Sequence, residues 1–178
     1  MRKYLVLLLA VIFMFYTFNK SEAEEDLIPN DAIRFRIIAN SNAIYDQNIK
    51  IQLRNVIQNK IFDLLNGTDD IDKTRKIMKE NVKTLDALVD KTLKELNYDK
   101  KYKINYGYNY FPEKKYKGIK YKEGKYESLV ITLGNGEGDN WWCVLFPPLC
   151  LVEADDSKTT DAEYTFFVKE IIEKYIKK

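Results

Sequence analysis

The chain has 178 residues, 46% hydrophobic and 31% charged, and this length and composition predict a single globular domain. It contains no histidine, which excludes serine–histidine and cysteine–histidine catalysis and the common histidine-containing zinc sites. Residues 1–23 carry three basic residues and one acidic residue, so the remainder holds 26 of each, without the basic surplus that nucleic-acid binding needs.

The first 23 residues have the layout of a secretory signal peptide. A short basic start precedes an apolar run of 15 residues, and Ser21-Glu22-Ala23 fits a small-x-small cleavage site. The run is short for a membrane span, which needs about 20 residues, although an uncleaved segment can still act as an anchor. We expect residues 1–23 to be a signal peptide or an N-terminal membrane anchor. We expect the chain to contact a membrane only through this segment. Residues 24–30 then form a linker, and 31–178 a single domain.

The first predicted strand covers residues 33–37, where apolar and basic side chains alternate with a period of two. Isoleucine and phenylalanine share the face that we expect to be buried. Arg34 and Arg36 share the other face, where we expect them to be solvated or paired with carboxylates across the sheet. Contact with an anion or a partner is the alternative. Asn40-Ser41-Asn42 ends the strand with side chains that favour turns and helix caps.

Two amphipathic helices follow, each with its apolar residues at helical spacing. The first has its apolar stripe at Ile49, Leu53, Val56, Ile57, Ile61, Leu64 and Leu65. It ends at Asn66-Gly67, and the second begins at Asp69-Asp70, where acidic residues favour the helix start. The second has its stripe at Ile71, Met78, Val82, Leu85, Val89, Leu93 and Leu96. Both stripes indicate packing against a core.

The period returns to two over residues 102–110, which predicts a strand with four tyrosines and one isoleucine on one face. We expect a core face with hydroxyl groups at its rim, and a sugar- or peptide-binding face is the alternative. A basic, tyrosine-rich connection, 111–125, leads to another strand at 126–133.

Residues 134–150, GNGEGDNWWCVLFPPLC, hold both tryptophans and both cysteines. Alternating glycines predict a loop with unusual dihedral angles or close backbone approach. A short buried strand, 142–146, follows and must end at two prolines. One interpretation is a hydrophobic strand between tight turns. The other is an aromatic recognition surface carried on the loop.

The two cysteines, Cys143 and Cys150, both lie beyond the signal peptide. In an exported protein this suggests a disulfide with Pro147-Pro148 making its turn. Two buried thiols, acting as small apolar side chains, are the alternative.

The last predicted element is a helix that a capping box, Thr160 to Glu163, begins. Its buried side comprises Tyr164, Phe167, Val168, Ile171, Ile172 and Tyr175. The order of elements is strand, two helices, three strands, helix. Consecutive strands are expected to pair antiparallel, with the helices over one face of the sheet. The order therefore predicts a two-layer α+β domain with a mainly antiparallel sheet, a helix pair and a C-terminal helix.

No pattern of residues indicates catalysis. The spaced glycines lack the sequence of a phosphate-binding loop, and Glu137 and Asp139, two apart in a loop, have no fixed separation. Cys143 has no histidine to act as its base. We therefore expect a protein that is not an enzyme, without a catalytic residue, a cofactor or a metal.

Two stretches resemble the stage II sporulation protein R family. Residues 28–41, IPNDAIRFRIIANS, are similar to its opening motif, and residues 138–150, GDNWWCVLFPPLC, to its second hallmark. Shorter matches lie at Phe111-Pro112, Tyr116, Gly118 and 124–127. The resemblance runs from about residue 28 to 152, with the motifs in the order of the family.

The resemblance implies a sporulation signal made in the forespore and exported into the space between two membranes, where it activates a membrane-bound aspartic protease of the mother cell. That protease processes pro-sigma-E. The receptor-binding candidates are Asp139, Asn140, Trp141, Trp142, Arg34 and Arg36. One alternative is a secreted, cell-wall-associated glycan-binding or hydrolytic domain, and another is a secreted structural protein without a receptor.

Overall fold

Strand β1 (Ile33–Ile38) is an inner strand of a four-stranded sheet with the order β2-β5-β1-β6. The computed structural model describes residues 27–151 and 160–176. In it, β1 pairs in parallel with β5 (Gly124–Leu133) and antiparallel with β6 (Asn140–Phe146). At the opposite edge, β2 (Tyr102–Phe111) pairs antiparallel with β5.

The sheet is therefore mixed, within the α+β single domain that the order of elements predicts. The expectation that consecutive strands pair is confirmed for β2 and β5 and wrong for β5 and β6, because β1 lies between them. The physical reason is burial. Four of the six β1 residues are buried, namely Ile33, Arg34, Phe35 and Ile37, and they lie on both faces of the strand. A strand that is covered on both faces belongs inside a sheet.

The predicted signal peptide, 1–23, lies outside the described residues, as do residues 24–26 of the predicted linker. Ile28, which was assigned to that linker, is 6% exposed and packs among core side chains, so it belongs to the folded domain. Among the helices that the structure describes, none combines the length and apolar character of a membrane span.

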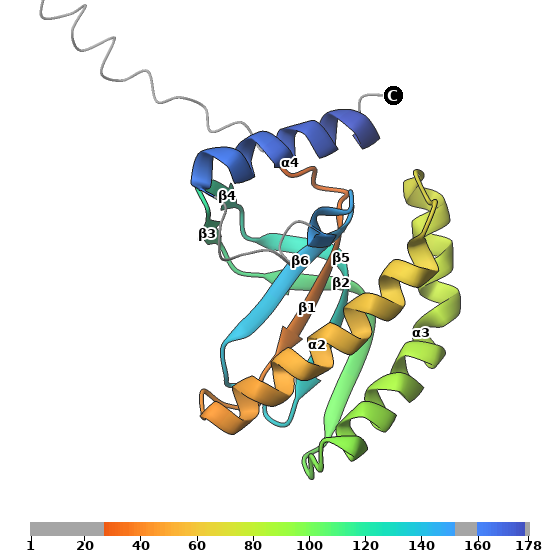
Figure 1. Cartoon of the computed structure of the whole chain (residues 1–178), viewed down its shortest axis with the longest axis vertical. Helices are drawn as coiled ribbons and strands as arrows, with labels where there is room; N and C mark the ends of the chain where they lie inside the picture. The colour runs from red at the N-terminus through yellow and green to blue at the C-terminus, as the bar shows by residue number, and fades with distance from the viewer. Residues whose placement is uncertain (1–26, 152–159, 177–178) are drawn as a thin grey trace, which may run out of the picture.

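Helices α2 (Ile44–Leu65) and α3 (Ile71–Glu95) lie side by side over one face of the sheet (Figure 1). The predicted stripes supply the helical part of the main core: Ile49, Leu53, Ile57, Ile61, Met78, Leu85, Val89 and Leu93 are buried. From the sheet, Phe35, Ile37, Leu129 and Ile131 are completely buried opposite them. Val56, which was expected on the stripe, is 38% exposed.

The helix ends are as predicted. Gly67 has a φ of +75° after α2, and the Asp70 carboxylate accepts a hydrogen bond of 2.8 Å from the Lys73 amide at the start of α3. Helix α4 (Asp161–Ile176) begins with a reciprocal capping box, in which Thr160 N–H donates to Glu163 and Glu163 N–H donates to the Thr160 hydroxyl.

The second face of the sheet carries a smaller core that the sequence did not indicate. Part of the predicted connection 111–125 is a hairpin, β3 (Lys114–Tyr116) and β4 (Ile119–Tyr121). Its central residues both have positive φ, +45° at Lys117 and +79° at Gly118, as in a type I′ turn. The hairpin and α4 together cover Val144 and Leu149 on this face.

The tyrosine strand divides into two parts. Tyr102 and Tyr106 pack against the main core, and their hydroxyl groups donate to Asp86 and Glu127 at its rim, as expected. Tyr108 and Tyr110 are 74% and 56% exposed, so the expectation of a continuous core face is wrong for them.

Candidate functional site

The glycine loop that precedes β6 is held by the turn that follows β1. Asn135 N–H donates to the Asn40 side chain at 3.1 Å, and Asp139 N–H donates to the Asn42 side chain at 2.6 Å. A Cβ atom at Gly138 would lie 2.3 Å from the Ser41 carbonyl oxygen, which only glycine tolerates. Close backbone approach, one of the two predicted roles of these glycines, is thus confirmed, and the loop fixes where β6 begins.

A buried carboxylate stabilises the turn that follows β1. Asp46, at the start of α2, accepts hydrogen bonds from the Asn40 amide at 2.7 Å and the Ser41 hydroxyl at 2.6 Å. These two bonds lower the pKa of Asp46, burial opposes them, and Lys100 at 3.5 Å lowers it further. The ionised form therefore stabilises the segment that positions the glycine loop.

Asp46→Asn is expected to lower the free energy of unfolding by about 2 kcal/mol at pH 7, because bonds to a charged acceptor are lost. A folded pKa below the unfolded value gives stability that is present above about pH 4 and is lost as pH falls through the folded pKa. In urea titrations the difference from the wild type should therefore shrink toward pH 3.

Asp90→Asn is the matched control, because Asp90 pairs with Lys94 on the exposed surface of α3. Such a pair contributes little, so this variant should differ from the wild type by less than about 1 kcal/mol. A difference for Asp46→Asn that stays constant from pH 7 to pH 3 would contradict the role of the ionised carboxylate.

The two tryptophans lie on opposite faces of β6 and are both half-buried. Trp141 packs edge-on against Phe35 of the main core, with ring centres 5.5 Å apart. Trp142 packs edge-on against Tyr121 and Phe111 of the second face, at 4.8 Å and 5.5 Å. Each ring is thus partly buried and partly accessible. The interpretation as a hydrophobic strand is confirmed, and the aromatic recognition surface stays a prediction.

Arg34 is buried at 1% exposure, so the expectation of a solvated or carboxylate-paired side chain is wrong for it. Its guanidinium lies 3.3 Å from the centre of the Tyr126 ring and 5.5 Å from that of Trp142. Its Nε and Nη1 atoms have no hydrogen-bond partner among the described residues. Burial lowers the pKa of Arg34, and the neighbouring Tyr126 opposes this shift.

Arg36 is half-buried beside Arg34 on the same face of β1. Its Nη1 donates to the Tyr110 carbonyl oxygen at 3.2 Å, and its Nε has no partner within the described part of the chain. Burial lowers its pKa as well. The two arginines are therefore packed against strand and aromatic groups, and the Arg34 guanidinium lies over the Trp142 ring.

A small pocket of about 80 Å³ lies between β6 and the hairpin β3–β4. Five consecutive strand residues, 140–144, form one wall, and Lys114, Tyr116 and Tyr121 of the hairpin form the other. We call this pocket the edge groove. Asn140, Trp141 and Trp142, predicted from sequence as receptor-binding candidates, all line it. Asp139 lies directly before it, whereas Arg34 and Arg36 lie outside its walls.

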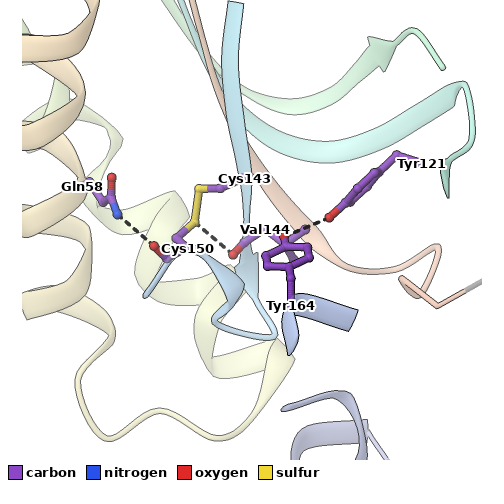
Figure 2. Close-up of a disulfide and its surroundings, with 6 residues drawn as sticks. All are labelled: Gln58, Tyr121, Cys143, Val144, Cys150 and Tyr164. Carbon is purple, nitrogen blue, oxygen red and sulfur yellow. Dashed lines mark hydrogen bonds between the residues drawn. A yellow bond between two sulfur atoms is a disulfide. The ribbon is translucent and has the colours of Figure 1, made fainter. Parts of the chain in front are cut away.

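Cys143 and Cys150 form the predicted disulfide, which is buried (Figure 2). Cys143 also lines the edge groove. The disulfide joins β6 to the short helix η1 (Leu149–Leu151). The Gln58 side chain donates a hydrogen bond of 3.0 Å to the Cys150 carbonyl oxygen and so ties the same segment to α2. On the other face of β6, the Tyr121 and Tyr164 hydroxyl groups lie 3.3 Å apart.

The sequence missed Lys50, Arg54 and Lys114, which bring positive charge to this end of the molecule. Lys50 donates to the Asp139 carbonyl oxygen at 2.9 Å, and Arg54 and Lys114 lie 5.3 Å and 5.6 Å from the rings of Trp141 and Trp142. No group of metal-ligating side chains occurs in the described ranges. The arrangement offers an edge strand, two aromatic rings and a cationic rim, which suit the recognition of another chain.

Comparison with known proteins gives a consistent result. The family model for stage II sporulation protein R matches residues 29–156. The curated stage II sporulation protein R of Bacillus subtilis (strain 168) is 36% identical over 137 residues, covering 77% of this chain and 61% of that protein. The matched region thus spans less than two thirds of the relative. No solved structure matches the chain.

Proposed function

Because the chain belongs to the stage II sporulation protein R family, we propose that it is a secreted signal of endospore formation. In this proposal the forespore exports the chain into the space between the two membranes. There it activates the membrane-bound aspartic protease of the mother cell that processes pro-sigma-E. The observation that carries the proposal is the family match over residues 29–156, which includes the edge groove, the disulfide and both arginines.

The disulfide supports export. Disulfides persist in oxidising compartments outside the cytoplasm, and the bridge between Cys143 and Cys150 is a structural one, buried at 2% and 0% exposure. The apolar segment at the start of the chain supports the same location.

Activation requires contacts that differ between the active and the inactive state of the protease. A signal can turn on a protease only if it binds the active conformation or assembly more tightly than the inactive one. Half-buried tryptophans on a rigid strand are the kind of side chains that dominate binding energy at interfaces. We propose Asp139, Asn140, Trp141 and Trp142 as the receptor contacts.

The proposal is tested by co-expressing the full chain, the cognate candidate protease and pro-sigma-E in a host that does not sporulate. We expect the precursor to shorten on a blot only when the chain is present with its first 23 residues. Unchanged precursor, in cells that secrete folded chain, would reject the proposed function.

Trp141→Ala is expected to reduce processing at least tenfold while secretion continues, because alanine removes the ring from the proposed contact surface. Phe166→Ala is the matched control, since Phe166 is an aromatic residue of α4 with 71% exposure. The measurement is the rate of precursor shortening at equal amounts of secreted chain. Normal processing by Trp141→Ala would remove Trp141 from the receptor contacts.

One observation favours a second function. Tyr108 and Tyr110 are exposed on β2, where flat rings with hydroxyl groups can stack on sugars. A secreted wall-associated glycan-binding or hydrolytic domain would use them. Retention of the chain on purified peptidoglycan, or release of soluble fragments from it, would support this function, and loss of retention in Tyr108→Ala would assign it to these rings.

A further inference from the structure

We propose that the outer edge of β6 is a docking site for an extended, acidic segment of a partner protein, which joins the sheet as an additional strand. This inference deepens the proposed function, on which it rests for the identity of the partner. It specifies how a receptor segment is recognised, namely by main-chain pairing along the strand and by the charge of its side chains.

The first argument is the open edge of the strand. In the described part of the chain, β6 pairs with β1 on one side and with no strand on the other. Alternate residues of an edge strand direct their N–H and C=O groups outward, away from the paired strand. A segment laid along this edge satisfies those groups, which is how strand addition generates affinity without requiring one particular sequence.

The second argument is the shape of the edge groove. Neighbouring side chains of a strand point to opposite faces, yet all of residues 140–144 line one pocket, which fits a position along the strand's edge. The hairpin forms the opposite wall through Lys114, Tyr116 and Tyr121. A volume of about 80 Å³ accommodates a side chain and not a whole strand. The partner backbone therefore lies along the edge and places one side chain in the groove.

The third argument is charge. Lys114 is part of the groove wall, and Arg54 lies beside Trp141. Burial lowers the pKa of Lys50, and the charge of Asp139 opposes this shift. The positive charges of Lys114 and Arg54 lower the pKa of Lys50 further, so the three cations are close enough to repel one another. Carboxylates on the incoming segment relieve this repulsion, so the rim selects an acidic segment over a basic one.

The chain provides its own reporter for the test, because both of its tryptophans line the groove. The full chain is titrated with an octapeptide of alternating glutamate and valine, and with its counterpart in which lysine replaces glutamate. We expect the acidic octapeptide to change tryptophan fluorescence saturably and to bind at least tenfold more tightly than the basic one. Equal binding of both, or no saturable change at millimolar peptide, would overturn the proposal.

The double variant Arg54→Glu/Lys114→Glu reverses the rim and should weaken binding of the acidic octapeptide at least tenfold. Lys79→Glu/Lys83→Glu makes the same charge change on the exposed surface of α3 and should bind as the wild type does. Unchanged binding by the rim variant would overturn the charge argument. A dimer that the acidic octapeptide fails to dissociate, seen by light scattering, would assign the edge to a second copy and would also overturn the proposal.

Co-expression separates this inference from the proposed function. If the wild type triggers precursor shortening, the rim variant should reduce it at least tenfold and the α3 variant should not. If the wild type triggers no shortening while the acidic octapeptide binds at the rim, the edge groove stands and the proposed function fails. If the rim variant still triggers normal shortening of the precursor and the wild type does not bind the acidic octapeptide, the proposed function stands and the docking site is rejected.

Discussion

Replacing both cysteines, Cys143→Ala with Cys150→Ala, is expected to lower the free energy of unfolding by about 2.5 kcal/mol. The bridge joins residues separated by seven positions, and closing so short a loop removes roughly this much chain entropy from the unfolded state. Alanine is preferred to serine because both positions are buried, where an unpaired hydroxyl would add its own cost. The measurement is a urea titration followed by tryptophan fluorescence.

The effect should be global in stability and local in structure. The bridge fixes η1 against β6, and the Gln58 hydrogen bond to Cys150 remains as a second tie to α2. We therefore expect the largest increase in amide exchange in β6 and η1, and in α3 only the increase that the lower global stability brings. Gln58→Ala in the oxidised protein is the comparison, because it removes one hydrogen bond and should cost about 1 kcal/mol. A urea midpoint equal to the wild type would show that the bridge does not stabilise the fold.

Much of the helical structure follows from local rules. The stripes of α2 and α3, the glycine after α2, the aspartate at the start of α3 and the capping box of α4 depend on residues close together in sequence. The end of β6 at Phe146 also follows locally, because proline has no N–H for the ladder. For these elements pattern and structure agree.

The position of β1 within the sheet does not follow from local rules. Its alternation predicts a strand with one buried face, and nothing local states that β5 and β6 lie on its two sides. Pairing at a distance of about a hundred residues is decided by total burial, which a window of neighbouring residues does not contain. The hairpin β3–β4 could have been predicted from the sequence, since Lys117-Gly118 lies between two short runs with aromatic residues.

The same limit explains Arg34. An arginine on the polar face of an alternating strand is ordinarily solvated, but Phe111, Tyr126 and Trp142 arrive from three other strands and close over it. The predicted receptor-binding candidates Asn140, Trp141 and Trp142 share one pocket at the start of β6, and their role stays a prediction. The basic residues near this pocket were not predicted. Lys50, Arg54 and Lys114 lie on elements that the fold brings together and that no spacing in the sequence connects.

Arg34→Ala is expected to lower the free energy of unfolding by about 3 kcal/mol, because it removes a large, fully buried side chain from beneath three aromatic rings. Arg34→Met retains most of the volume and removes a buried charge whose Nε and Nη1 atoms have no partner among the described residues. Replacing buried charges by apolar groups of similar size is often neutral, so Arg34→Met should stay within about 1 kcal/mol of the wild type.

The pair of variants also decides what the charge contributes to signalling. Arg34 is 1% exposed and lies beneath Trp142, so it acts on a partner through the position of that ring. Arg34→Met should therefore retain precursor processing in co-expression, and Arg34→Ala should reduce it because Trp142 loses its support. A stable Arg34→Met chain that fails to trigger processing would show that the receptor senses the charge itself. A loss of 3 kcal/mol in Arg34→Met would show that the contact of the guanidinium with Tyr126 stabilises the fold beyond its packing.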